Sequence, residues 1–215
     1  MNLKLHLSNK KIWLLGLLFL TFSIVNAATV TSNGSGNWST GATWVGGVAP
    51  TAGDNVIIAA GHTVSVGTST GIINVTINSG ATLNIGIRNL TISGFFINNG
   101  TVTGTSGRLT TTTGASINNG SIVLSSGRIT LTAGSFTNNG SISMTTGRLI
   151  QTSGSITNTA TGTIAFSGTG TITFGTGNFI NLNTSASVNF GSSPITITGT
   201  AISQSIGGFT TTGTV

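Results

Sequence analysis

Residues able to carry acid–base or nucleophilic chemistry are scarce in this sequence of 215 residues. It contains one carboxylate side chain, Asp54, no cysteine, and a single histidine in the body of the chain, His62. Hydrolysis of a glycosidic bond normally needs two carboxylates flanking that bond. A Ser-His-Asp arrangement would draw on Asp54 and His62, but no serine has the G-x-S-x-G context of a nucleophile elbow. We therefore predict no catalytic residues, with Asp54 and His62 both in turns.

The same inventory argues against a metal site. Calcium-binding β-rolls repeat an Asp in their turns, because carboxylates supply most of the affinity for the ion. The recurrent turns of this chain are instead Asn-Asn-Gly, at residues 98–100, 118–120 and 138–140. These turns are neutral, so the sequence predicts neither a metal ion nor a cofactor.

Arginines, in contrast, recur at a constant interval, at Arg88, Arg108, Arg128 and Arg148. Stacked along one corner of a repeat structure, they would form a column of like charges that repel modestly. One interpretation is a strip that binds acidic polysaccharide or lipopolysaccharide phosphate, since arginine holds both in bidentate fashion. The other is a solvated ridge that keeps an otherwise uncharged protein soluble. We favour the ridge, because charge copied with a repeat needs no ligand.

Threonine pairs of the form Thr-x-Thr also recur along the chain. Alternation within a strand would point both members of a pair outward, as on the flat ice-binding faces of some solenoid antifreeze proteins. Ordinary β-propensity on a solvent-facing surface explains the same residues, and Ser93 and Ile150 interrupt the array. An ice-binding face is therefore kept as an alternative, made of Thr91, Thr110, Thr112, Thr130, Thr132 and Thr152.

All these residues belong to a repeat with a period of ~20 residues, which is typical of a solenoid. Short runs with period-2 alternation lie between turn residues, which predicts three strands and three corners in each coil. We expect Asn and Gly at the corners because they tolerate positive φ. A column of asparagines in register should also hydrogen-bond along its length.

The fold class that follows is all-β, a right-handed parallel β-helix with three sides and an N-terminal cap. Equivalent residues of successive coils would lie ~4.8 Å apart, and parallel crossover connections are right-handed. A β-sandwich or barrel is the alternative, although strict registration at one period is unusual there. The predicted inner columns are Val102, Ile122 and Ile142; Leu109, Ile129 and Leu149; and Ile97, Ile117, Phe136 and Ile156.

Composition divides the chain into four parts. Residues 1–27 have the pattern of a signal peptide, because lysines precede an apolar run, 12–25, that is shorter than the ~20 residues needed to span a bilayer. Residues 28–66 form a cap and the first strands, since their tryptophans have no counterpart in the repeat. Residues 67–157 are the regular coils. Residues 158–215 are irregular coils that we expect to continue beyond the chain end, because nothing there resembles a cap.

The net charge and the predicted signal peptide limit the kinds of partner that the protein can have. Without residues 1–27 the chain keeps four arginines and one acid, a net charge of 4 − 1 = +3. A net charge this low, without aromatic side chains on which bases could stack, argues against nucleic-acid binding. The signal peptide predicts a secreted or outer-surface protein with no membrane span in its mature form. The expected partners are extracellular polysaccharide, or a host or other cell surface.

The segment after the signal peptide carries a pattern of Trp, Gly, Pro and Asp residues: Trp38, Trp44, Gly46, Gly47, Pro50, Asp54, Val56, Ile58, Gly61 and Val64. This pattern resembles the opening of large secreted β-helical repeat proteins of the Bacteroidota. The resemblance covers the N-terminal part well and the repeats in general character. It implies an adhesin-like surface protein of the kind that often ends in a type IX secretion sorting domain, and no such domain is recognisable in this sequence.

Together these observations predict a secreted, non-catalytic solenoid that forms the stalk or passenger segment of an adhesin. Two alternatives stay open, an ice- or surface-binding solenoid and a non-catalytic polysaccharide-binding module. A β-helical carbohydrate enzyme is opposed by the missing carboxylates.

Overall fold

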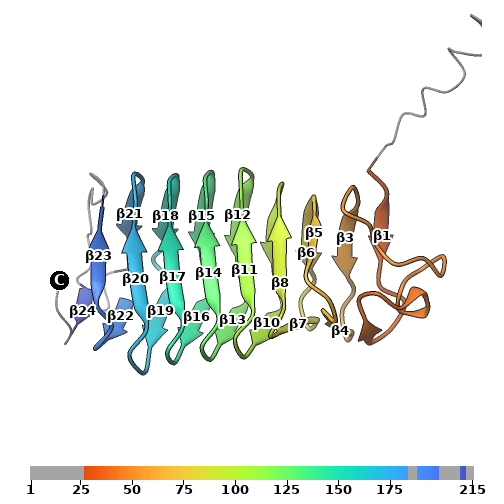
Figure 1. Cartoon of the computed structure of the whole chain (residues 1–215), viewed down its shortest axis with the longest axis horizontal. Helices are drawn as coiled ribbons and strands as arrows, with labels where there is room; N and C mark the ends of the chain where they lie inside the picture. The colour runs from red at the N-terminus through yellow and green to blue at the C-terminus, as the bar shows by residue number, and fades with distance from the viewer. Residues whose placement is uncertain (1–26, 184–187, 199–208, 212–215) are drawn as a thin grey trace, which may run out of the picture.

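The computed structural model describes residues 27–183, 188–198 and 209–211, which form a β-solenoid of three parallel sheets (Figure 1). In the regular part of the stack each coil contributes one strand to each sheet. Each strand therefore pairs with the strand that is third after it along the chain. The only helical element in the described ranges is a 3-10 turn, η1 (Gly41–Thr43). The predicted fold class, a parallel solenoid with a short and nearly constant coil length, is confirmed.

We number the three sheets I to III. Sheet I comprises β1 (Thr29–Thr31), β3 (Asn55–Ile58), β6 (Asn74–Ile77), β9 (Phe96–Asn98), β12 (Ala115–Asn118), β15 (Ser135–Asn138), β18 (Ser155–Asn158) and β21 (Asn178–Asn181). Sheet II comprises β2 (Gly36–Asn37), β4 (Thr63–Ser65), β7 (Thr82–Gly86), β10 (Thr101–Gly104), β13 (Ser121–Leu124), β16 (Ser141–Met144), β19 (Thr163–Phe166), β22 (Val188–Gly191) and β24 (Phe209–Thr211). Sheet III comprises β5 (Thr70–Ile72), β8 (Asn89–Ile92), β11 (Arg108–Thr111), β14 (Arg128–Leu131), β17 (Arg148–Gln151), β20 (Thr171–Phe174) and β23 (Ile195–Ile197).

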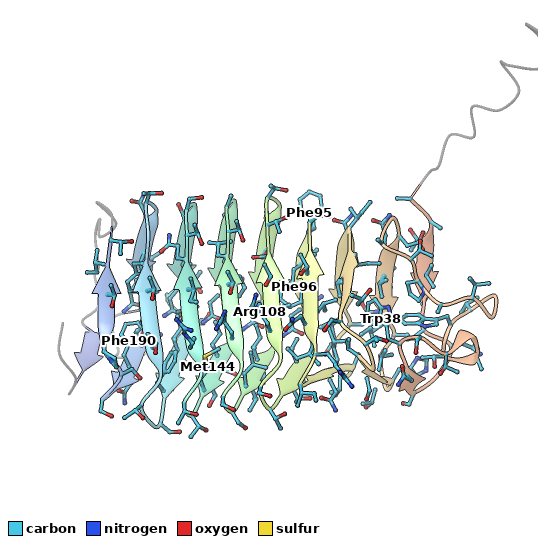
Figure 2. The ribbon with its side chains drawn as sticks, viewed as in Figure 1. Trp38, Phe95, Phe96, Arg108, Met144 and Phe190 are labelled. Carbon is cyan, nitrogen blue, oxygen red and sulfur yellow. The ribbon has the colours of Figure 1, made fainter. Side chains whose placement is uncertain are left out.

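Period-2 alternation sends every second side chain into the stack. In β13, Ile122 and Leu124 are buried while Val123 between them is exposed. The inner residues pair with their counterparts one coil away, which confirms the predicted columns led by Val102 and Leu109. One apolar core therefore runs along the stack, with Phe96 and Phe190 inside it, whereas Phe95 is exposed (Figure 2). Full burial of each such side chain is worth ~1.5–3 kcal/mol.

The predicted inner column of sheet I is wrong at Ile97 and Ile117. These two residues pair with each other on the outer face and are half-buried, whereas Phe96 and Ser116 occupy the inner column with Phe136 and Ile156. The cause lies at the end of each strand, where an asparagine points inward. Because side chains alternate, the inner residue must be the one two positions before that asparagine.

Buried asparagines form a continuous ladder along the corner that follows sheet I. Each Nδ2 donates to the Oδ1 of the next coil, over 2.7 Å from Asn98 to Asn118, 2.7 Å from Asn118 to Asn138 and 2.7 Å from Asn138 to Asn158. The ladder continues over 2.9 Å to Asn181. The second Nδ2 hydrogen of Asn118 is directed at the backbone oxygen of Ser141, 3.1 Å away. The predicted asparagine column is therefore confirmed, but it lies inside the core.

A second asparagine ladder runs on the outside of the same corner. Asn119 donates to Asn99 over 2.8 Å, and Asn139 donates to Asn119 over 2.7 Å. Donation here runs toward the N-terminus, opposite to that of the inner ladder. The two rows of amide dipoles thus oppose each other across one corner.

Close approach between coils explains the glycines of this corner. None of the three glycines in the Asn-Asn-Gly corners has a positive φ, so the expected reason for glycine is wrong there. A Cβ on Gly120 would instead collide with the carbonyl oxygen of Gly100, and one on Gly140 with that of Gly120. Positive φ does occur in the repeating Gly-Ser/Ala corner, at Gly134 and Gly154, both at 81°.

Coil length changes toward both ends of the stack. The coil that separates Val64 from its strand partner Leu83 is shorter than the regular period, and the coil that separates Ile142 from its partner Ile164 is longer. At the N-terminal end, the side chains of Trp38 and Trp44 complete the core. Their rings meet edge to face, with the two ring centroids 5.2 Å apart. The indole N–H of Trp44 donates to the backbone oxygen of Trp38 over 2.7 Å, which holds the two residues together.

The first prediction tests which side chains face inward. Replacing Ile129, 2% exposed, by Asp puts an unpaired charge in the core and should cost several kcal/mol of unfolding free energy. Thr110→Asp, on the outer face of the neighbouring strand, should stay within ~1 kcal/mol of the parent. Urea unfolding of the two variants decides, and equal destabilisation would contradict the assignment of the two faces.

The second prediction uses two adjacent asparagines as a matched pair. Asn118→Ala removes a donor to Asn138 and an acceptor for Asn98 inside the core, and should cost ~2 kcal/mol or more. Asn119→Ala likewise removes one donor and one acceptor from an asparagine ladder, here the exposed one, and should cost less than ~1 kcal/mol. Thermal or urea unfolding measures both. A larger loss at Asn119 would show that the inner ladder does not stabilise the stack.

Candidate functional site

The arginines lie on the outer face of sheet III. Arg108, Arg128 and Arg148 are the first residues of β11, β14 and β17, and pair in register on these adjacent strands. Arg108 is labelled on its strand in Figure 2. Neighbouring parallel strands lie ~4.8 Å apart, so three backbone positions that carry guanidinium groups follow each other at that spacing. We call these three residues the arginine strip.

Arg88 does not continue the arginine strip in register. The strand partner of Arg108 in the preceding coil is Asn89, and Arg88 lies in the turn before β8. The coil from Asn89 to its strand partner Arg108 is one residue shorter than the regular period. A shift in pairing opposite Thr103 and Gly104, where β7 bulges, accompanies this change. The backbone oxygen of Arg88 still accepts a hydrogen bond of 3.0 Å from the Arg108 N–H, so the two residues are close neighbours.

The arginine strip carries unbalanced positive charge. The one acidic residue of the sequence, Asp54, binds Thr51 and Ala28 through its carboxylate, so the described part of sheet III offers the strip no carboxylate partner. Arg108 and Arg148 are exposed, whereas Arg128 between them is half-buried. Burial, and then repulsion from Arg108 and Arg148, lowers the pKa of Arg128 below its usual value. The middle guanidinium is therefore the one that gains most from an anion.

The threonines lie on this same outer face, beside the arginine strip. Thr91, Thr110 and Thr130 form one in-register column, which Ile150 then interrupts. Thr112, Thr132 and Thr152 follow in the turns directly after the strands. On each of these three coils, the outer face therefore carries an arginine together with the residues two and four positions after it. We call this surface of β11, β14 and β17, with the turns that follow, the Arg/Thr face.

The threonine hydroxyls are unequally available. The Oγ1 atom of Thr130 is buried and has no hydrogen-bond partner among the described residues. The Thr112 hydroxyl approaches the backbone oxygens of Ile92 and Ser93, at 3.5 and 3.3 Å, whereas Thr132 and Thr152 are exposed. A threonine array suited to ice would be flat, uncharged and continuous. On the Arg/Thr face the Thr130 hydroxyl is buried, Ile150 interrupts the column and a row of arginines runs along its edge, which argues against the ice-binding alternative.

Sequence reasoning missed a serine beside His62. The Oγ atom of Ser32 lies 2.8 Å from His62 Nδ1 and accepts the Ala59 N–H at 2.9 Å. Ser32 is only 3% exposed, so this pair fastens the cap to the turn between β3 and β4 rather than presenting a nucleophile. The two partners are far apart in the sequence, and no motif marks Ser32.

Asp54 does not complete a triad with this pair. Its Oδ2 accepts the Thr51 N–H at 2.7 Å and the Thr51 hydroxyl at 2.8 Å, and its Oδ1 accepts the Ala28 N–H at 3.3 Å. These bonds, led by that of the Thr51 N–H, hold the pKa of Asp54 below its usual value. Asp54 is therefore a turn-forming carboxylate in the structure. Among the described residues, no three of His, Cys, Asp and Glu gather where they could share a metal ion.

Comparisons with family models, with curated proteins and with solved structures found no match to this chain. Within the described ranges, no helix has the length and apolar character needed to cross a bilayer. The functional argument therefore rests on the geometry of the stack and of its outer faces.

Proposed function

We propose that this protein is a secreted or cell-surface structural solenoid without catalytic activity, which forms the stalk or passenger segment of an adhesin. The observation that carries the proposal is the continuity of the stack along its axis. All three sheets pair coil to coil, and the asparagine ladders add side-chain hydrogen bonds in the same direction. Such an element is stiff and elongated, as a spacer that holds a binding region away from a cell must be.

The non-catalytic part of the proposal draws on the state of the few reactive groups. Ser32 is buried and bonded to His62, while Asp54 is occupied by Thr51 and Ala28. General acid–base catalysis needs a titratable group within hydrogen-bond reach of a substrate. The polar side chains that recur in rows on the described outer faces of the coils are arginine, serine, threonine and asparagine, and none of them is a carboxylate or an imidazole.

Secretion and surface location draw on the sequence. Residues 1–27 have the lysines, the apolar run and the small residue at position 27 that a signal peptidase recognises. The Trp, Gly, Pro and Asp pattern that follows resembles the opening of Bacteroidota surface proteins. A charge-poor, Thr- and Ser-rich exterior also suits a stalk, which needs solubility but no ligand in every coil.

The third prediction tests location and the spacer role together. When the chain is produced in a bacterial host with an epitope tag in the exposed turn at residues 125–126, protease should reach the tag on intact cells. The mature N-terminus, read by mass spectrometry, should be Ala28. A tag reached only after lysis, with Met1 retained, would contradict secretion.

Two deletions serve as controls for the spacer role. Removing residues 118–137 deletes one full period, so the remaining coils can stack in register and display should persist. Removing residues 118–127 deletes half a coil and should abolish folding, because the inner and outer columns no longer align. Loss of display in both deletions would show that this coil has a role beyond spacing.

Release of reducing ends from a polysaccharide panel, abolished by Asp54→Ala, would contradict the non-catalytic assignment.

A further inference from the structure

We propose that the Arg/Thr face of sheet III binds a linear anionic polysaccharide, with carboxylates or sulfates on the arginine strip and sugar hydroxyls beside the threonines. This proposal goes beyond the structural role. A stalk without a ligand and a ligand-binding segment that is not a stalk are both physically coherent, so either statement can fail alone.

The geometry of the arginine strip suits a repeating ligand. Arg108, Arg128 and Arg148 start three adjacent strands in register, so their side chains leave the sheet from one line at a spacing of ~4.8 Å. A linear polymer with an acidic group on successive sugars presents a row of charges along a line of its own. Contacts between two such rows reinforce one another, because the first contact raises the effective concentration of the next.

Electrostatics supplies the driving force. The guanidinium of Arg128 is half-buried between two like charges, and the strip has no carboxylate partner in the described part of the chain. An anion that bridges neighbouring arginines removes their mutual repulsion and adds charge-assisted hydrogen bonds. A purely solubilising ridge has no need for arginine in particular, since acidic residues improve solubility more than basic ones do. The sequence alone favoured that ridge, and the register and burial of Arg128 favour the binding strip.

The surroundings of the strip favour a sugar polymer over other polyanions. The outward residues beside it on β11, β14 and β17 are Thr110, Thr130 and Ile150, and Thr132 and Thr152 are exposed in the following turns. Single-stranded nucleic acid would call for aromatic side chains on which bases stack. The outward positions of these three strands hold none. Hydroxyl groups beside a row of cations match a chain that carries both acidic groups and hydroxyls.

The test measures binding of the purified protein to heparin and to alginate, with dextran as the uncharged control, over a series of salt concentrations. Heparin supplies sulfates and alginate only carboxylates, so the two arms identify the acidic group preferred. The parent should bind at least one of them at physiological salt, where exposed charges are screened over about 8 Å, and should not bind dextran.

Arg128→Gln and Arg88→Gln remove the same charge and form the matched pair. Arg128→Gln should weaken binding about tenfold or more, as expected for a lost charge-assisted hydrogen bond. Arg88→Gln, outside the strip register, should weaken it less than about threefold, the screened effect of one surface charge. Arg128→Lys should recover only part of the affinity, since an ammonium cannot bind bidentately. Both positions face outward, and unchanged thermal melts of the variants confirm that each is folded.

Three results would overturn the proposal. Elution of the parent protein from both immobilised heparin and immobilised alginate below physiological salt would identify the arginines as a solvated ridge. Equal losses from Arg128→Gln and Arg88→Gln would show that net charge, not the strip, is responsible. Tighter binding to single-stranded DNA, or to vesicles that contain phosphatidylglycerol, would assign the face to a different class of partner.

Discussion

In-register pairing of parallel strands between successive coils is the constraint on which the rest of this structure depends. Val102, Ile122 and Ile142 share one inner column only because β10, β13 and β16 pair residue for residue. The same pairing places asparagine above asparagine at the corner and arginine above arginine outside. A sequence with so few charges thereby acquires continuous rows of one chemistry, apolar within, amide at one corner and cationic on one face.

The inner asparagine ladder is the feature that makes this register specific. An apolar column tolerates a shift of two residues along the strand at moderate cost, since its side chains stay on the inner face and most aliphatic side chains pack against one another. Asn118 in contrast needs a donor from one side, an acceptor on the other and the Ser141 oxygen at the corner. A slip by one residue would leave several buried amide groups without partners, which is far more costly than a packing defect. The glycines next to this ladder then allow the coils to approach closely, because the space a Cβ would need is filled by the carbonyl of the coil before.

Much of this arrangement could be predicted from the sequence, and the failures have physical reasons. The inner columns of sheets II and III followed from clear alternation of apolar and polar residues. Ile97 and Ile117 were misassigned to the inner face, which Phe96 and Ser116, one position before them, occupy. The residue that fixes this register is a buried asparagine, and a polar residue is expected on the outer face. Arg88 was placed in the strip because its spacing from Arg108 matches the period. The coil that joins strand partners is one residue shorter there, so Asn89 takes the position in register with Arg108. The contact of Ser32 with His62 joins segments with no repeat and no motif, so only the folded chain reveals it. That arginines and threonines share one face follows from the alternation within a strand, once the strand boundaries are known.

Disulfide formation between introduced cysteines tests the registration of the coils most directly, because the chain contains no cysteine of its own. Val123 on β13 and Ser143 on β16 are exposed and paired, and Ser143 is paired in turn with Ala165 on β19. The account predicts that Val123→Cys/Ser143→Cys closes an intramolecular disulfide on mild oxidation, since paired Cα atoms ~4.8 Å apart lie within disulfide range. Val123→Cys/Ala165→Cys, two coils apart, should stay reduced or link separate molecules. Closure of the second pair within one molecule, or failure of the first, would contradict the in-register stack.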